Sequence, residues 1–507
     1  MLACGERSQA QMGQPKWASP NGPARRPHPI MNTRTASISV AGRLPAQRID
    51  SAGVAHVDQR AVLALALPLM ANSAIQVVLS LTDMWFIGHI STTALAAVAT
   101  VQWLVLVAVL ILGGTATSIQ TLAAQSYGSR RYARASQSVW IGLWATLCAA
   151  PLFVLVGAAG RLILAPFDFS AEIGTLAADF WFPRVGGATF GVAVWGMLGF
   201  FNGIGRPRIT LLITVVTTLA NVPLNYLFIF YWHGGVAGSG WATTVAQFLG
   251  LVLSVSIFLR EPFSSRYKSH LTWHPHWRPL REQLKLGLPT GLLPAADLLA
   301  LSIFQMMQVR LGTVGGAATQ MAMILASVAY MPGFGIASSG TTLVGQSIGA
   351  GDRAWGMRVG SRVILMTALF MGGIGILLAI VAPLLLPSFT GVHDADAQAA
   401  VALGGTLLWI AVIYQFFDGL NMGSGLCLRG AGDVAVPAAL VIPVSWLIFV
   451  PLAHSLTFAP GQGWVHFLPQ WGYGAIGGWA ALVIYVMLLG TALCLRWRSG
   501  AWQRINL

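Results

Sequence analysis

Three carboxylates lie inside long apolar stretches of this 507-residue chain: Asp83, Asp297 and Asp418. A carboxylate at membrane depth costs about 2.5 to 3.5 kcal/mol, so it persists where it faces water or a partner, and by default it marks an ion or substrate path. The alternative is a structural carboxylate that joins two helices by hydrogen bonds. We expect no Lys or Arg inside the spans to neutralise these acids, so a mobile cation is the natural counter-charge.

The elements that position these acids are predicted to be membrane-spanning helices. The chain is 56% hydrophobic and only 9% charged, whereas soluble proteins carry about 25% charged residues. This composition excludes a water-soluble protein. The net charge of +14 is scattered along the sequence, which argues against a nucleic-acid partner. Twelve segments of spanning length are predicted, at residues 61–88, 93–122, 134–158, 176–203, 208–231, 236–259, 281–309, 313–347, 356–386, 398–428, 434–457 and 472–495.

The two halves of the chain repeat. Pro68 and Pro289 are 221 residues apart, and so are Gln125 and Gln346. Later in each half, Gly203-x-Gly205 matches Gly430-x-Gly432. Because each half contains six predicted spans, the second half enters the membrane in the same direction as the first. We therefore predict an all-α integral membrane protein with twelve transmembrane helices in two six-helix lobes, related by a pseudo-two-fold axis along the membrane normal.

The predicted organisation has five parts. They are a disordered tail (1–60), a first lobe (61–260), a connector (261–280), a second lobe (281–498) and a short C-terminal tail (499–507). The first tail is rich in Pro, Gly, Ser and Arg and contains no apolar run that would order it. Met31 is an alternative start to Met1. No disulfide is expected, because Cys148, Cys427 and Cys494 lie in spans and Cys4 lies in the tail.

The basic residues orient the predicted bundle. If both termini are cytoplasmic, 26 of the 29 Lys and Arg residues lie on the cytoplasmic side, as the positive-inside rule requires. Only Arg161, Arg184 and Arg310 fall toward the other side. We expect a multi-pass protein of the plasma (inner) membrane with both termini in the cytoplasm.

The sequence resembles the multidrug and toxic compound extrusion (MATE) transporters from Arg60 to about Arg498, in the pattern of their NorM-like branch. The matching strings are Leu67-Pro68 followed by Leu81-Thr82-Asp83-Met84-Trp85-Phe86-Ile87-Gly88, Asn221-Val222-Pro223-Leu224-Asn225-Tyr226, Leu343-Val344-Gly345-Gln346-x-x-Gly349-Ala350, and Tyr414-Gln415-x-x-Asp418 leading to Leu428-Arg429-Gly430-Ala431-Gly432-Asp433. The resemblance implies a two-lobed secondary antiporter. Such a protein exports organic, mostly cationic, drugs and toxic compounds in exchange for inward Na⁺ or H⁺.

The resemblance also implies roles for individual residues. Asp83, Asp297 and Asp418 correspond to the ion-coupling acids of spans 1, 7 and 10, and Na⁺ is expected at Asp297 and Asp418, with H⁺ as the alternative. Asp297 is one methylene shorter than the Glu that is common in that branch, and Asn225 stands where another branch has a second Asp. The expected supporting polar residues are Asn221, Asn225, Tyr414 and Gln415. The expected substrate-cavity residues are Gln76, Trp85, Trp195 and Met306.

Other functions are less well supported by the sequence. A flippase for lipid-linked sugars, from a related superfamily, is expected to line its cavity with basic residues. A membrane-embedded enzyme is expected to show a metal or nucleophile cluster, and none is recognised. The protein is therefore not expected to be an enzyme. No cofactor is expected beyond the coupling ion, and the expected partners are the lipid bilayer and organic cations, with the chain acting as a monomer.

Overall fold

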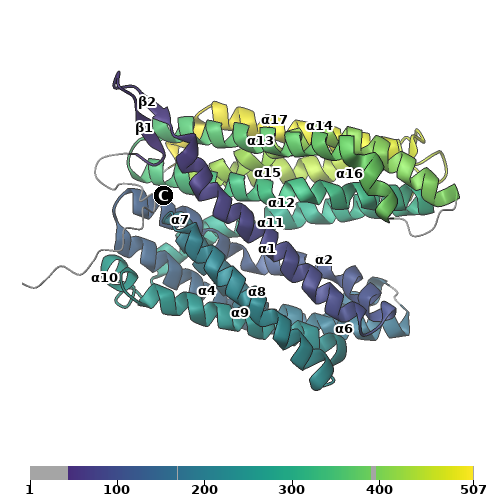
Figure 1. The fold of residues 1–507 in the computed structure, drawn as a ribbon, viewed down its shortest axis with the longest axis horizontal. Helices are drawn as coiled ribbons and strands as arrows, with labels where there is room; N and C mark the ends of the chain where they lie inside the picture. Colours follow the sequence, from purple (N-terminus) through teal and green to yellow (C-terminus); the bar gives the residue numbers. More distant parts are fainter. Residues whose placement is uncertain (1–43, 168–169, 390–394, 506–507) are drawn as a thin grey trace, which may run out of the picture. The chain divides into compact units, whose positions relative to one another are not determined.

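The computed structural model describes residues 44–167, 170–389 and 395–505. Nearly all of them are helical, apart from one two-stranded hairpin (Figure 1). The elements, in chain order, are β1 (Gln47–Ile49), β2 (Ala55–Val57), α1 (Gln59–Gly88), α2 (Thr92–Thr117), α3 (Ile119–Gly128), α4 (Tyr132–Ala158), α5 (Gly160–Leu164), η1 (Ala165–Phe167), α6 (Ala171–Gly186), α7 (Ala188–Gly203), α8 (Pro207–Tyr226), η2 (Leu227–Tyr231), α9 (Gly235–Leu259), α10 (Phe263–Tyr267), α11 (Trp277–Arg310), α12 (Thr313–Gly349), α13 (Arg353–Leu385), η3 (Leu386–Phe389), α14 (Ala395–Ala431), α15 (Ala435–Pro443), η4 (Val444–Phe449), α16 (Val450–Thr457), α17 (Gly474–Arg498) and η5 (Ala501–Arg504).

The predicted membrane spans are present. Within the described ranges, eleven helices are long and apolar enough to cross a membrane, and the pair α6 and α7 supplies a twelfth span with a bend of 43°. The bend has a local cause. Pro183, in the last turn of α6, has no backbone N–H to donate. Its carbonyl oxygen accepts a hydrogen bond from the Thr244 hydroxyl at 2.8 Å, so a side chain of α9 holds the bent segment.

Two further spans contain π-helical turns rather than a regular α-helix. The turn η2 follows α8 in the fifth span, and η4 follows α15 in the eleventh. A proline lies shortly before each turn, at Pro223 and Pro443. Such turns re-aim the side chains beside them and are frequent at functional sites.

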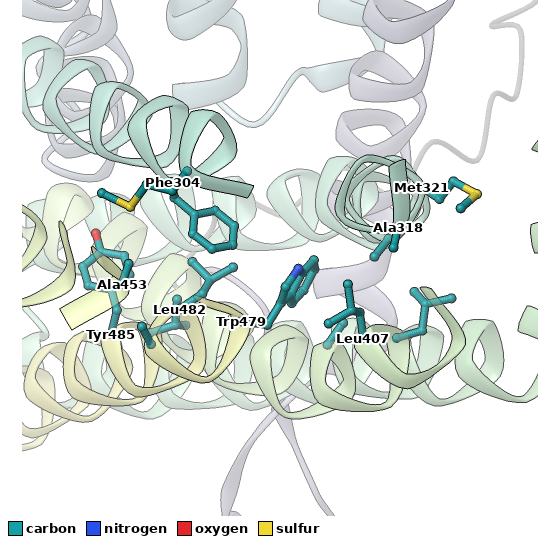
Figure 2. Packing of buried hydrophobic residues seen from close by; sticks show 14 of the residues in the cluster. Phe304, Ala318, Met321, Leu407, Ala453, Trp479, Leu482 and Tyr485 are labelled. Atoms are coloured by element: carbon teal, nitrogen blue, oxygen red, sulfur yellow. The ribbon is translucent and has the colours of Figure 1, made fainter. Parts of the chain in front are cut away.

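The second lobe contains a large apolar core. Its buried members come from every helix from α11 to α17 and from η3 and η4, and Trp479 is fully buried among them. Figure 2 shows Trp479 between Leu482 and Leu407, with Phe304 above and the Tyr485 hydroxyl on the other side of Leu482. The Trp479 indole N–H donates to the Thr319 hydroxyl at 3.2 Å. This bond and the core packing therefore hold α17 against α12. The same core includes α11 and α14, the helices that carry Asp297 and Asp418.

The predicted tail boundary at residue 60 is wrong. Strands β1 and β2 pair antiparallel just before α1, and Ala46 packs in a buried cluster with Trp355 of α13. The Trp355 indole N–H donates to the Pro45 carbonyl at 2.9 Å. Asp58 then caps α1 by accepting from the backbone N–H of Arg60 at 2.9 Å. The rest of the predicted tail, residues 1–43, lies outside the described residues.

Helix α1 connects the two lobes. Its first turns pack in the second-lobe cluster that contains Ile336 and Leu343 of α12, whereas its last turns contact α8 of the first lobe through Asp83 and Asn225. Figure 1 shows α1, in purple, running diagonally from the hairpin toward α8 and α6. We call the side that carries the hairpin and residues 499–505 the terminal end, and the opposite side the far end.

The lobes are joined at the terminal end by a reciprocal pair of hydrogen bonds. The Gln125 side chain donates to the Gly430 carbonyl at 3.0 Å, and the Gln346 side chain donates to the Gly203 carbonyl at 2.8 Å. Gln125 and Gln346 are equivalent in the repeat, and so are Gly203 and Gly430. We call these two bonds the glutamine pair. Each lobe donates one of these bonds and accepts the other, as a two-fold relation between the halves requires.

Two glycines allow the lobes to approach each other this closely. A Cβ on Gly128 would lie 2.1 Å from the Gln346 carbonyl oxygen, and a Cβ on Gly349 would lie 2.0 Å from the Gln125 carbonyl oxygen. Any larger side chain at either position would force the backbones apart. The hydrogen bonds Thr117–Thr290 and Gln120–Thr342 also lie at this end.

The connector packs against the first lobe. Its short helix α10 places Tyr267 in a buried first-lobe cluster with Phe200 and Phe258. The indole N–H groups of Trp140 and Trp144 donate to connector carbonyls at 2.7 and 2.8 Å. The helix α11 begins at Trp277, so the last four residues of the predicted connector belong to the seventh span.

Candidate functional site

The first-lobe acid is held by two neighbouring helices. Asp83, near the far end of α1, accepts a hydrogen bond from the Asn225 amide at 2.8 Å and another from the Thr243 hydroxyl at 3.1 Å. Asn221 accepts from Asn225 at 2.8 Å and donates to Thr243 at 3.3 Å. Asn221 and Asn225 are fully buried. Both carboxylate oxygens of Asp83 are therefore already hydrogen-bonded within the lobe.

Asp83 also has a charged neighbour that the sequence reasoning did not expect. Arg184 of α6 interacts electrostatically with Asp83, although the two side chains form no ion pair within 4.0 Å in the described structure. The sequence reasoning identified no Arg in the spans that could act on these acids, and Arg184 is such a residue for Asp83. Helical spacing could not reveal the pair, because Arg184 lies next to the proline bend in α6.

The second-lobe acid Asp297, on α11, is held in a similar way. The Tyr485 hydroxyl of α17 donates to its Oδ1, and the Ser445 hydroxyl lies 3.4 Å from the same oxygen. Ser445 and Tyr485 are also hydrogen-bonded to each other at 2.7 Å. Ser445 lies in η4, so the π-helical turn contributes its hydroxyl to the neighbourhood of Asp297.

The remaining acid, Asp418 of α14, is less well satisfied. It is 6% exposed. Its Oδ1 accepts one long hydrogen bond from Asn421, at 3.4 Å, and its Oδ2 is buried with no hydrogen-bond partner in the part of the chain that the structure describes. Asp418 interacts electrostatically with Asp297, as do the hydroxyls of Tyr330 and Tyr414 with both acids. The second lobe therefore gathers two carboxylates and several hydroxyls.

The predicted supporting residues of span 10 have different surroundings. Tyr414 lies in the electrostatic neighbourhood of the two acids. Gln415 is buried and its amide donates to the Ala326 carbonyl of α12 at 2.8 Å. The amide of Gln415 therefore anchors α14 to α12 instead of contacting Asp418.

The four predicted cavity residues do not form one group. Gln76 lies two turns before Asp83 on the same face of α1 and is half-buried, as is Trp195. Trp85 is exposed, and so is Met306, which lies on the face of α11 opposite Asp297. Gln76 alone of the four shares a helix face with an acid.

Sequence reasoning missed several contributors to the two sites. Thr243, Ser445 and Tyr485 bind the acids from spans 6, 11 and 12. Hydroxyl residues are common in spans, so their type gave no signal. The repeat does provide a signal, because in each lobe the first, fifth and sixth spans meet around a carboxylate.

No group of three or more His, Cys, Asp or Glu side chains in the described part of the chain is arranged to hold a metal ion. The second-lobe donor set consists instead of two carboxylates and tyrosine and serine hydroxyls. Hard oxygen donors of this kind suit an alkali cation or a proton rather than a transition metal.

Comparison with known proteins gives a family match over both lobes. The model of the MatE family matches residues 68–227 and again residues 298–454, one match in each half. Among curated relatives, a protein of Rhizobium meliloti called "Probable multidrug resistance protein NorM" is 26% identical over 450 residues, 87% of this chain and 92% of the relative. A relative of the same name from Chromobacterium violaceum is 28% identical over 471 residues, 89% of this chain and 95% of the relative.

Solved structures share the fold. "Crystal structure of MATE in the straight conformation" superposes with a TM-score of 0.76 at 19% identity and covers 88% of this chain and 96% of its own. "Crystal structure of eukaryotic MATE transporter AtDTX14" gives 0.75 at 15% identity and covers 87% of this chain and 96% of its own. These neighbours have twelve transmembrane helices in two lobes, which confirms the predicted fold class.

Proposed function

This chain belongs to the MatE family, and from that premise we propose that it is a multidrug efflux transporter. It exports organic, mostly cationic, compounds and takes up Na⁺ or H⁺ in exchange. The relatives named above as probable multidrug resistance proteins support this function. The family is one of transporters, and we propose no catalytic reaction.

The observation that carries the proposal is the unpartnered carboxylate oxygen of Asp418. A buried acceptor without a partner is costly to maintain, and a second carboxylate, Asp297, adds repulsion. Both costs fall when a cation binds between the acids. Binding of a cation therefore lowers the free energy of the second lobe. When that cation leaves, binding of another positively charged group has the same effect.

Coupling follows from competition for this negative charge. We propose that the coupling ion binds Asp297 and Asp418 and that its binding favours release of a cationic substrate. Asp83 makes no hydrogen bond to Asp297 or Asp418 in the described structure, and its hydrogen-bond donors Asn225 and Thr243 lie in the first lobe.

The orientation in the membrane is part of the proposal. The positive-inside pattern supports a cytoplasmic terminal end in the plasma (inner) membrane. With that orientation the glutamine pair holds the cytoplasmic side of the two lobes together. The reciprocal interface lies within one chain, so we propose that a monomer performs the cycle.

Na⁺ is the coupling ion that we favour. Two carboxylates with several hydroxyl oxygens make a hard-oxygen site for Na⁺, whereas a lone carboxylate in an apolar pocket more readily holds a proton. A cation entering down 100 mV supplies about 2.3 kcal/mol, and a tenfold gradient supplies about 1.4 kcal/mol. In a one-for-one exchange of monovalent cations the voltage contribution cancels, and only the chemical gradient remains.

Efflux from proteoliposomes with separately imposed gradients tests the proposal. A fluorescent lipophilic cation inside the vesicles should leave when an inward Na⁺ gradient is applied at fixed pH and clamped voltage. Efflux driven only by a pH gradient would replace Na⁺ by H⁺. Efflux under neither gradient, from correctly folded protein, would contradict the antiporter function.

The flippase alternative is not favoured by any specific observation. A pyrophosphate-binding cavity calls for several basic side chains, whereas Arg184 is a single guanidinium that lies beside Asp83. Uptake or flipping of a lipid-linked sugar by the same vesicles would revive this alternative.

A further inference from the structure

The repeat relates the two charged sites in a way that neither site shows alone. The offset of 221 residues places Gln76 opposite Asp297, and the offset between Gly203 and Gly430 places Gly191 opposite Asp418. Asp83 lies seven residues after Gln76. Since an α-helix has 3.6 residues per turn, the first-lobe acid is displaced by two turns from its repeat position, toward the far end.

The same displacement applied to the fourth span reaches Arg184. This span runs from the far end toward the terminal end, so two turns toward the far end from Gly191 is position 184. The first lobe thus has an arginine in the displaced position that corresponds to Asp418. In sequence, Asp83 and Arg184 each lie seven residues from the repeat position of a second-lobe acid, and one of the two charges has the opposite sign.

Contacts from a third helix support the proximity of Asp83 and Arg184. Thr243 of α9 donates to the Asp83 carboxylate at 3.1 Å. The next residue, Thr244, donates to the carbonyl of Pro183 at 2.8 Å, and Pro183 directly precedes Arg184. Adjacent hydroxyls of one helix therefore hold the acid of α1 and the bent segment of α6 that carries the arginine.

Among the described residues, the Nε of Arg184 is buried without a hydrogen bond. Arg184 lies on the face of α6 that also presents the buried Trp181 and Val185. An intramembrane arginine is expected to face a paired charge or a wet cavity. Asp83 is the acid that acts on it electrostatically.

We propose that the Arg184 guanidinium is a built-in counter-ion of Asp83. In the first lobe this guanidinium has the role that a bound coupling cation has between Asp297 and Asp418 in the second lobe. The first lobe is then already neutral and takes up no coupling ion. The first lobe therefore contains a permanent positive charge, Arg184, whereas the second lobe binds and releases the coupling cation. The part of this inference that concerns coupling rests on the proposed antiport, whereas the charge pairing does not.

Counting bound cations tests the proposal without any transport. Purified protein is compared with Arg184→Gln, Arg184→Lys and the double variant Arg184→Gln/Asp83→Asn. Bound ²²Na⁺ is measured at equilibrium, and protonated carboxylic acids are detected by their infrared carbonyl band. We expect Arg184→Gln to hold one more cation per protein than the unmodified chain, either as Na⁺ or as a new protonated acid. Arg184→Lys and the double variant should return to the original count.

The outcomes separate the two proposals. An unchanged ²²Na⁺ count together with no new acid band in Arg184→Gln would overturn the counter-ion role. If Arg184→Gln does not fold, the double variant is compared with it. A double variant that folds supports the pairing of Arg184 with Asp83, whereas a double variant that is no more stable than Arg184→Gln contradicts it. A failure of drug efflux in the unmodified chain would contradict the antiport function and leave these cation counts unaffected.

Discussion

The terminal end and the charged sites obey the repeat to different degrees. At the terminal end, Gln125 and Gln346 make the same hydrogen bond to equivalent glycine carbonyls of the opposite lobe. In the lobe interiors, equivalent helices surround a carboxylate, yet the acids lie at different heights and Asp418 has no acidic counterpart in the first lobe. Contacts that hold the two similar lobes together are symmetric, whereas the buried charged residues inside the lobes differ.

The largest effect is expected from a substitution of Asp418, the acid that has no acidic counterpart in the first lobe. Asp418→Asn should reduce ion-driven efflux at least about tenfold, because Asn retains the side-chain shape but has no negative charge to hold a cation. Initial efflux rates in proteoliposomes measure this. Asp396→Asn is the matched control, since Asp396 is an exposed residue in the first turn of the same helix. Efflux from Asp418→Asn at the unmodified rate would reduce Asp418 to a structural residue.

The symmetric contact gives the next largest effect, and it should be equal in the two lobes. Gly128→Ala and Gly349→Ala each place a Cβ about 2 Å from a backbone oxygen of the other lobe, an overpacking that costs roughly 1 to 3 kcal/mol. Both variants should open the terminal end, which cysteine-labelling rates at that end report. Gly373→Ala is the control, because nothing lies within 4 Å of its added Cβ. Unequal effects of the two variants would contradict the symmetry.

A smaller effect is expected at the partner of Asp297. Tyr485→Phe removes the hydroxyl that donates to the carboxylate, and such a bond favours the charged form that Na⁺ requires. A hydrogen bond to a charged group is worth about 1.5 to 3 kcal/mol. The half-saturating Na⁺ concentration for efflux should therefore rise about tenfold. Tyr473→Phe, at an exposed tyrosine just before the same helix, should leave it unchanged.

The smallest effect is expected outside both regions. Removal of residues 1–30 should leave efflux unchanged, because that segment has too little apolar surface to dock on the lobes. Trp355→Phe, in contrast, removes the indole N–H that holds Pro45 and should lower the unfolding temperature. Equal expression of the shortened and full-length chains is the necessary control. Loss of efflux from a well-expressed shortened chain would show that the segment contributes to transport.

Apolar length and the repeat were sufficient to predict the spans and the two lobes. They did not predict the hairpin, because strands of three residues are too short to show an alternating pattern. They also did not place Arg184 in the neighbourhood of Asp83, because its position depends on a proline bend and on Thr244 of another span. The motif that contains Asn225 predicted a supporting polar residue but not its partner, and the structure shows that its amide donates to Asp83.

The glutamine pair also influences how well the transporter captures its cargo. If each of its two hydrogen bonds contributes about 1 kcal/mol, together they disfavour the conformation with an open terminal end by about 30-fold. A compound that binds only that minority conformation shows an apparent dissociation constant weaker than its intrinsic one by the same factor. Weakening Gln125 or Gln346 would then improve capture at low concentrations of the compound, at the expense of a slower closure of the terminal end once the compound is bound.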